Sequence, residues 1–504
     1  MINAIKSFGS IAMMMLTLIY VHTGNSIADD WPMRGGTPGR CSWSHESDGP
    51  AHWTIGPKWK DANSRDSKNV LWHADGFYEG KGSPVVSQGL VWIGTSNTQG
   101  VRGMDAGVLT CFRANDGQKV YERVSAKLGQ PGSGYQVAHR DWPGTGITSS
   151  PLIEGNRLWY CTNRLEIVCL DIDALVSQTG MPSELWSVDL SKLFGVMPRD
   201  VHLGSPASRC SLVGYKDWLY TTTTHSRNSE GAFDSTLPSL VCLNKTTGQM
   251  HWKDSSPGEG LFQEPHANPT IVELKDRALV AIGQGDGWLR AFDCDTGKPV
   301  WQFNMNDRSS QRPLKKHTSL RVVESPAFDG ERLYVVAGEQ YEASMILGRI
   351  VALDPRRNGN ISTMRIDESG IAVPNPNNGC SWELNGTLEI PFEVCVGGVA
   401  VDDQFVFAGT LQGEVFCFDK RTGEICWKHD MKASLLTTPL IVGDKVYVAD
   451  EAGDVEILRA SRFYEKIFQQ NHQDCFEASP VYSNGTLFLQ SRSGLWAIRK
   501  DASK

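Results

Sequence analysis

The chain has 504 residues, of which 40% are hydrophobic and 21% are charged, a composition typical of a folded protein. Acidic residues outnumber basic ones by 57 to 49, giving a net charge of −8, which excludes a general nucleic-acid binder because such proteins need a basic surface. The length is typical of roughly three domains, unless an internal repeat builds one large closed unit.

The first 28 residues have the three parts of a secretory signal peptide. Lys6 supplies a positive charge, residues 11–21 form an apolar run, and Ser26 and Ala28 are the small residues of a cleavage site. The apolar run is short for a bilayer span, which needs about 20 residues; the alternative is a signal retained as an uncleaved anchor. We therefore expect a periplasmic or extracellular monomer whose mature chain has no transmembrane span.

Residues 29–68 form a tryptophan-rich extension. It contains Trp31, Trp43, Trp53 and Trp59, and four indole rings left in water would make an unusual apolar surface. We expect the extension to pack on the domain that follows it.

From residue 69 to residue 500 the chain repeats one short pattern. A strand ends in a tight turn, often D-x-x-T-G, and in several copies a tryptophan stands four residues after the glycine. Aspartate supports such a turn through the backbone, and glycine accepts its positive φ angle. The copies align on positions 111, 169, 242, 291, 352, 417, 457 and 497. Their spacing varies while the pattern is constant, which indicates one repeated supersecondary unit with variable loops.

A second strand pair of the form S-P-x-V-x-x-G-x-V-W-I-G precedes most copies, for example at 83–95 and 479–491. Two strand pairs per repeat predict four-stranded antiparallel blades, and eight repeats predict an all-β, eight-bladed β-propeller. The last repeat, 477–500, stops after three strands, whereas residues 69–75 form a further strand with Trp72. We predict that this N-terminal strand completes the eighth blade and closes the ring, leaving 501–504 as a tail.

Aromatic residues and glycines at fixed places in the repeat are predicted to be structural. A flat ring at the same position of each blade suits packing between neighbouring sheets. We assign to this blade motif Trp72, Trp252, Trp301 and Trp427, together with Gly117, Gly248, Gly297 and Gly423. The segments 225–238 and 355–392 interrupt the pattern and are interpreted as insertions.

The twelve cysteines are interpreted chiefly as small buried side chains. Cys111, Cys169, Cys242 and Cys417 occupy the repeat position at which other copies have alanine, and a free cysteine packs as a small apolar residue. Export permits disulfides, so pairing of Cys380 with Cys395 or of Cys417 with Cys426 stays open. The spacing of cysteines and histidines resembles no zinc site.

The repeat D-x-x-T-G-x-x-x-W resembles that of pyrroloquinoline quinone (PQQ)-type propellers, a family that includes quinoprotein alcohol dehydrogenases and the outer-membrane assembly protein BamB. The segment Trp31–Gly36, W-P-M-R-G-G, is similar to the start of exported PQQ-like propeller proteins of bacteria such as planctomycetes. The resemblance implies a propeller over nearly all of residues 69–500, but it describes blade packing and not catalysis.

The dehydrogenases of this family are expected to carry an adjacent Cys-Cys pair, calcium ligands and a catalytic aspartate. This sequence has no Cys-Cys pair and no C-x-x-C-H haem motif. It also lacks a cysteine close after the apolar run, where BamB carries its lipid. These departures put both quinone catalysis and a direct transfer of the BamB role in doubt.

Candidate functional residues lie just before the innermost strands, because these segments converge near the axis of a propeller. They are Asp141, His202, Glu264, His266, Glu324, Glu393 and Glu477. Charged groups near an apolar inner ring are costly unless they are paired or solvated. One interpretation is a polar channel held by ion pairs; the other is a small-molecule or cation site, since carboxylates and histidines are ligands for Ca²⁺ or a transition metal. No catalytic residue is assigned.

Two functional hypotheses follow. The first is an exported, non-catalytic binding or scaffolding module of the cell envelope, with BamB-like architecture and a protein or polysaccharide partner. The alternative is a periplasmic quinoprotein oxidoreductase with a divergent site that uses PQQ and Ca²⁺.

Overall fold

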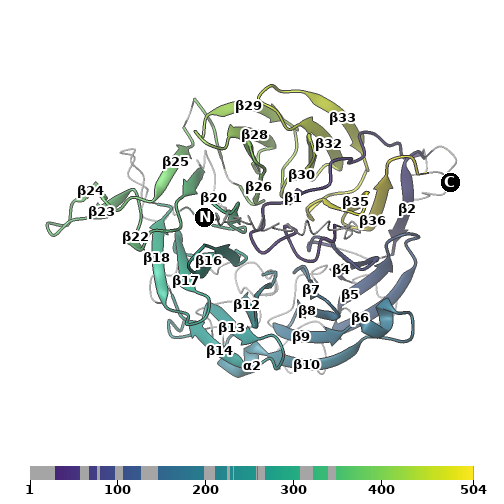
Figure 1. Cartoon of the computed structure of the whole chain (residues 1–504), viewed down its shortest axis with the longest axis horizontal. Coiled ribbons are helices and arrows are strands. Elements are labelled where there is room, and N and C mark those ends of the chain that lie inside the picture. The colour runs from purple at the N-terminus through teal and green to yellow at the C-terminus, as the bar shows by residue number, and fades with distance from the viewer. Residues whose placement is uncertain are drawn as a thin grey trace, which may run out of the picture.

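The computed structural model describes residues 29–56, 67–76, 80–96, 106–126, 146–197, 210–223, 228–230, 232–256, 258, 267–306, 320, 322–338, 348–387, 389–393 and 395–502. These residues form eight sheets arranged as a ring, which confirms the eight-bladed β-propeller (Figure 1). The predicted signal peptide, residues 1–28, lies outside the described residues.

Each blade has four antiparallel strands that run from the axis outward. Blades 1 and 2 comprise β3 (Val85–Ser87), β4 (Leu90–Ser96), β5 (Ala106–Arg113) and β6 (Lys119–Ala126), then β7 (Leu152–Glu154), β8 (Arg157–Cys161), β9 (Glu166–Asp171) and β10 (Ser183–Asp189). Blades 3 and 4 comprise β11 (Val213–Tyr215), β12 (Trp218–Thr222), β13 (Leu240–Asn244) and β14 (Met250–Asp254), then β15 (Thr270–Glu273), β16 (Ala278–Gly283), β17 (Trp288–Asp293) and β18 (Pro299–Asn304).

The second half of the ring follows the same plan. Blades 5 and 6 comprise β19 (Ala327–Phe328), β20 (Leu333–Ala337), β21 (Arg349–Leu353) and β25 (Cys380–Asn385), then β26 (Val399–Val401), β27 (Phe405–Gly409), β28 (Glu414–Asp419) and β29 (Ile425–Asp430). Blade 7 comprises β30 (Leu440–Val442), β31 (Lys445–Ala449), β32 (Asp454–Arg459) and β33 (Lys466–Asn471), and blade 8 comprises β34 (Val481–Ser483), β35 (Thr486–Gln490), β36 (Gly494–Arg499) and β2 (Val70–Asp75).

The two ends of the ring are joined by β2. This N-terminal strand pairs antiparallel with β36, and Trp72 lies opposite Ala497. The pairing confirms the predicted closure and leaves blade 8 with the same four strands as its neighbours. Because β36 is covered, the ring has no free strand edge at its seam, where an open edge would invite association.

In seven blades the residue at the centre of the third strand is cysteine or alanine, and its partner on the outermost strand explains its small size; blade 7 has Ile457 there. Cys111 faces Tyr121, Cys242 faces Trp252 and Ala497 faces Trp72. The same register pairs Cys169 with Trp186, Ala291 with Trp301, Ala352 with Trp382, Cys417 with Trp427 and Ile457 with Phe468. A small side chain leaves room for the aromatic ring, which then reaches the next blade.

The turn glycines receive these rings. A Cβ atom added to Gly423 would lie 2.5 Å from Trp382 of the preceding blade, and one added to Gly297 would lie 2.6 Å from Trp252. Trp382 also donates a hydrogen bond of 2.9 Å to the Lys420 carbonyl in the same turn. Five rings donate in this way to a backbone carbonyl of the next blade: Trp72, Trp186, Trp252, Trp382 and Trp427. Trp301 Nε1 has no hydrogen-bond partner among the described residues.

Trp186 and Trp382 were not assigned to the blade motif from sequence, because insertions displace their strands. The outer strand of blade 2 is preceded by α1 (Asp173–Val176), and a second short helix, α2 (Leu190–Phe194), follows it. In blade 5 the segment 355–392 contains the outermost strand β25 itself, after β22 (Gly359–Asn360) and the hairpin of β23 (Met364–Ile366) and β24 (Ala372–Pro374). β22 adds to the outer edge of blade 4, while the hairpin projects from the ring (Figure 1).

Residues 29–56, named the strap here, lie across the middle of the ring, where they are drawn in purple (Figure 1). The short strand β1 (Trp43–Ser44) within the strap pairs parallel with β30. The backbone N–H groups of six innermost strands donate to strap carbonyls: Val86 to Trp31, Ile153 to Pro32, Ile271 to Pro38, Phe328 to Gly39, Val401 to Cys41 and Ile441 to Ser42. The strap therefore satisfies inner-strand groups that no other strand pairs.

One strap glycine is required by this close approach. A Cβ atom on Gly39 would lie 2.5 Å from the carbonyl oxygen of Phe328, so any larger residue would push the strap away from blade 5.

All twelve cysteines are free thiols, and neither of the two pairings considered from the sequence is formed.

Candidate functional site

The residues that precede the innermost strands line an axial cavity of about 300 Å³. Its described lining consists of Arg34 from the strap with Lys81, Thr148, Asn268, Val323, Glu324, Val396, Leu411, Leu436 and Glu477 from the ring. The strap forms backbone hydrogen bonds with residues further along the innermost strands, such as Val86 and Ile441. The cavity therefore lies at the strand starts, and the strap, through Arg34, lies at its inner end.

Glu324 is the best-bonded carboxylate of this cavity. Its Oε1 accepts from Arg34 Nε at 3.2 Å and from Asn268 Nδ2 at 2.5 Å, and its Oε2 accepts from Arg34 Nη2 at 2.6 Å. The backbone N–H and hydroxyl of Ser325 also donate to Oε1. Burial by itself would raise the pKa of Glu324, but the charge of Arg34 and these hydrogen bonds outweigh it and hold the pKa below its usual value.

Glu477 is held by two cations. Lys81 Nζ lies 3.0 Å from Oε2, and Arg492 Nη2 donates to Oε1 at 2.7 Å. Burial opposes ionisation here too, but Lys81 and Arg492 lower the pKa of Glu477 below its ordinary value. Both carboxylates are therefore ionised at neutral pH, and each has a cationic partner.

A second strap arginine is buried under the cavity. Arg40 is only 3% exposed, and its guanidinium donates to the carbonyls of Pro269, Arg34, Ser211 and Leu212. Burial lowers the pKa of Arg40 to about 10, so the side chain still carries its charge at neutral pH. Arg40 connects the strap to blades 3 and 4 and fixes the backbone from which Arg34 extends.

The structure brings together two of the seven residues proposed from sequence. Glu324 and Glu477 line the same cavity. Glu393 is not among its described lining residues, and burial, with a contribution from Glu414, raises the pKa of Glu393. Asp141, His202, Glu264 and His266 lie outside the described residues, so their placement stays a prediction.

Arg34, Arg40 and Asn268 were missed as site residues. Asn268 holds the position that serine takes before the proline in other repeats, so the substitution was a signal. The arginines belong to W-P-M-R-G-G and the residues after it, far from the repeats that carry Glu324. No repeat-based argument could place them on the axis.

The described residues do not fit a bound Ca²⁺ or a quinone held by one. Glu324 and Glu477 already face Arg34, Lys81 and Arg492, whose charges would repel a cation. In the part of the chain that the structure describes, no three histidine, cysteine, aspartate or glutamate side chains lie close enough together to hold a metal ion.

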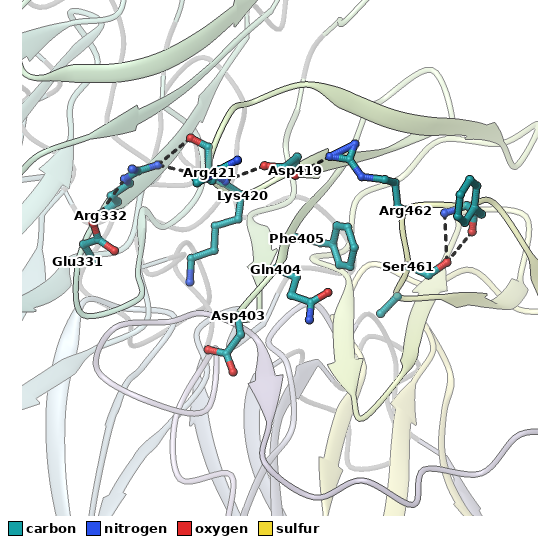
Figure 2. Close-up of a pocket in the computed structure, with 12 residues that line it drawn as sticks. Glu331, Arg332, Asp403, Gln404, Phe405, Asp419, Lys420, Arg421, Ser461 and Arg462 are labelled. Atoms are coloured by element: carbon teal, nitrogen blue, oxygen red, sulfur yellow. Dashed lines mark hydrogen bonds and ion pairs between the residues drawn. The ribbon is translucent and has the colours of Figure 1, made fainter.

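A second candidate site is a surface pocket of about 680 Å³ between the turns of blades 5, 6 and 7 (Figure 2). Arg332 donates to the carbonyls of Lys420 and Arg421, and Arg462 pairs with Asp419 at 2.8 Å. Beside these, Phe463 is 80% exposed. Arginine and aromatic side chains are enriched at protein interfaces, so this groove, defined by its turn residues 331–332, 403–405, 419–421 and 460–463, is a candidate docking surface.

The described residues include no helix long and apolar enough to cross a bilayer.

A family model described as outer membrane protein assembly factor BamB matches residues 172–365 and 348–463, more than half of the chain. BamB of Bordetella pertussis is 25% identical over 223 residues, which cover 44% of this chain and 47% of that protein. BamB of Burkholderia pseudomallei is 26% identical over 273 residues, covering 49% and 65%. The matches thus span between about half and two thirds of these curated relatives.

Solved structures show the same fold. BamB from Moraxella catarrhalis superposes with a TM-score of 0.51 at 15% identity, covering 86% of this chain and 98% of that one. The quinohemoprotein alcohol dehydrogenase from Comamonas testosteroni gives a TM-score of 0.50 at 14% identity, covering 93% and 80%. At such identities the likeness concerns architecture alone. With the repeats, the eight blades and the family match in agreement, this chain belongs to the BamB family of PQQ-like β-propellers.

Proposed function

We propose that this protein is an exported, non-catalytic binding or scaffolding module of the cell envelope, located in the periplasm or outside the cell. Membership of the BamB family supports the proposal, because the matched relatives are named as assembly factors of outer membrane proteins.

The observation that carries the proposal is the state of the axial carboxylates. Glu324 and Glu477 are each engaged by cations of the chain's own strap and ring. Ion pairs of this kind hold the blades and the strap together, and they leave neither carboxylate as an obvious general base or metal ligand. The arrangement favours a structural axis with function on the outer surface.

The docking groove of Figure 2 is the surface that we propose for a protein partner. Arg421 is exposed, and its guanidinium forms no hydrogen bond or ion pair with another described residue. Together with the exposed ring of Phe463 it offers a cation and an apolar anchor, the residue types that dominate binding energy at interfaces. An extended segment with an acidic and an aromatic or aliphatic residue would match this pair.

A deletion strain of the source organism tests the scaffold role. We expect lower levels of outer-membrane β-barrel proteins in the deletion strain, and restoration by the wild-type gene but not by Arg421→Glu/Phe463→Ala. Met181→Ala, which removes a side chain that is 66% exposed on blade 2, is the matched control and should restore the levels. Unchanged β-barrel levels, or recovery of the protein in the cytoplasmic fraction, would contradict the proposal.

The quinoprotein alternative has a separate test. The purified protein is incubated with PQQ and Ca²⁺, and quinone absorbance and dye-linked alcohol oxidation are recorded. Stoichiometric uptake with turnover would overturn the non-catalytic proposal. A protein that retains no quinone at saturating concentrations would end the alternative.

A further inference from the structure

A small polar cavity, named the strap cavity here, lies between the strap and the ring. Its volume is about 20 Å³, which is enough for one water-sized particle. The polar side chains that line it include Trp31, Arg34 and Arg40 of the strap and Ser83, Thr438 and Ser479 of the ring. The described lining contains no aspartate or glutamate, so the charges that it carries are positive.

The three ring hydroxyls occupy equivalent places, each directly before the proline that precedes an innermost strand. Each oxygen accepts from a backbone N–H of the preceding blade: Thr438 from Gly398 at 2.9 Å, Ser479 from Thr438 at 2.9 Å and Ser83 from Ser479 at 3.1 Å. None of the three hydroxyls donates its own proton to another described residue. A hydroxyl group can donate as well as accept, so these three protons are available to a ligand in the strap cavity.

The indole of Trp31 is a fourth donor at this cavity. Trp31 is only 4% exposed, and no described residue accepts from its Nε1. The indole N–H donates and cannot accept, and leaving such a group buried without an acceptor is costly. The indole and the hydroxyls therefore form a set of donors that a single strong acceptor would satisfy.

Arg40 adds a buried charge to these donors. Its guanidinium donates to four backbone carbonyls and forms no ion pair with a described residue. The carboxylate of Glu324 is already engaged by Nε and Nη2 of Arg34. The pKa of Arg40, about 10, keeps the side chain charged at neutral pH. Because a buried cation without a counter-ion is costly, an anion beside Arg40 would stabilise the fold.

We propose that the strap cavity binds one chloride ion. A monatomic anion accepts hydrogen bonds from any direction, so it can receive the Trp31 N–H and the three hydroxyl protons while it balances the charge of Arg40. A water molecule also accepts hydrogen bonds, but it brings no negative charge. Sulfate and phosphate have five heavy atoms and exceed a volume of about 20 Å³. The donors come from the strap and from blades 1, 7 and 8, so the ion connects the strap to the ring.

Thermal unfolding of the purified protein tests for chloride binding. Sodium chloride is exchanged for sodium gluconate at constant pH and ionic strength, so that screening of the ion pairs stays the same. We expect the temperature of unfolding to rise with chloride concentration and to level off, because a ligand that binds the folded chain stabilises it by mass action. Equal unfolding temperatures in the two salts, or a rise that does not saturate, would overturn the proposal.

A matched pair of variants locates the ion. Trp31→Phe removes the indole donor and breaks no side-chain hydrogen bond of the described chain. We expect it to raise the chloride concentration for half of the stability gain at least tenfold, since a hydrogen bond to a charged group is lost. Trp301→Phe makes the same change at another buried indole without an acceptor, far along the chain in blade 4, and should leave the chloride response unchanged. Equal responses of the two variants would refute the site.

Crystals grown in sodium bromide give a direct view of the occupant. We expect an anomalous difference peak beside Trp31, Ser83 and Ser479, because bromide replaces chloride and is identified by its anomalous scattering. Electron density at this position without an anomalous signal would show that the cavity holds water, and the proposal would then be wrong.

Discussion

The charged side chains at the axis are paired, and the effect of each one on stability depends on its partner. The side chains of Arg34 and Glu324 are only 13% and 10% exposed and lie 2.6 Å apart, although the two residues are 290 positions apart in the sequence. Removing one partner of a buried ion pair strands the other charge, whereas removing both does not. The pair therefore connects strap and ring more strongly than an exposed pair would.

A double-mutant cycle measures this coupling. We expect Arg34→Met to lower the free energy of unfolding by about 3 kcal/mol, because it leaves the Glu324 carboxylate buried without its cation. The double variant Arg34→Met/Glu324→Gln should be more stable than Arg34→Met alone. Urea unfolding of the four proteins gives the coupling free energy; strictly additive effects would show that the pair does not link strap and ring.

His472 makes the stability of the molecule depend on pH. It is fully buried, and its Nε2 accepts from Trp53 Nε1 of the strap at 3.2 Å. Burial, with a contribution from His73, lowers the pKa of His472 from 6.5 to about 3. Below pH 6.5 the unfolded chain takes up a proton on His472 that the folded chain does not, and this stabilises the unfolded state. The free energy of unfolding therefore keeps its full value above pH 6.5 and decreases as the pH falls from 6.5 toward 3.

From these pKa values we expect protonation of His472 in the unfolded chain to lower the unfolding free energy of the wild-type protein by about 2 kcal/mol when the pH falls from 7 to 5. His472→Gln keeps an acceptor for Trp53 but does not titrate, so its stability should fall by about 2 kcal/mol less over the same range. Urea titrations at both pH values make the comparison. Parallel pH profiles of the two proteins would show that His472 is not the titrating group.

At the scale of elements, the joint between blades is an aromatic ring on a turn glycine. Gly423 has a φ angle of 75° and lies against Trp382, whereas Gly330 has a φ angle of 94° with nothing within 4 Å of an added Cβ. Both positions disfavour a side chain through the backbone, but only Gly423 adds a clash. The two glycines therefore separate backbone strain from blade packing.

We expect Gly330→Ala to cost about 1 kcal/mol from backbone strain alone. Gly423→Ala should cost about 2 kcal/mol more, because the methyl group displaces the Trp382 ring from a packed joint. Thermal and urea unfolding of both variants give the difference. Equal losses would mean that the ring moves freely and that the joint contributes little to the ring of blades.

At the scale of the whole molecule, the N-terminal region closes the ring in two independent ways. β2 completes blade 8 at the seam, and the strap binds the innermost strands across the middle of the ring. The first device removes an open edge, and the second ties blades that are distant in sequence to one another. Their contributions are separable because the strap ends before β2 begins.

Two truncated chains test this separation. A chain that starts at residue 57 loses the strap and nine backbone hydrogen bonds between the strap and the rest of the described chain. At about 0.5–1 kcal/mol each, its unfolding free energy should fall by about 5 kcal/mol or more while it stays monomeric. A chain that starts at residue 77 also exposes the edge of β36 and should associate. Light scattering and calorimetry distinguish them; a monomeric, cooperative chain from residue 77 would show that closure by β2 is dispensable.

The repeats determined the architecture by themselves. Eight blades and their closure were indicated by three features: the small residues at 111, 242 and 497, the D-x-x-T-G turns, and the further strand at 69–75. Such features are local and recur with the blade. They also indicated that charged residues before the innermost strands approach the axis, as Glu324 and Glu477 do. Only the tertiary structure decided what those charges do. Arg34 and Arg40 reach the axis through a strap that has no repeat, and ion pairing between residues 290 positions apart depends on the path of the chain across the ring, which no local pattern encodes.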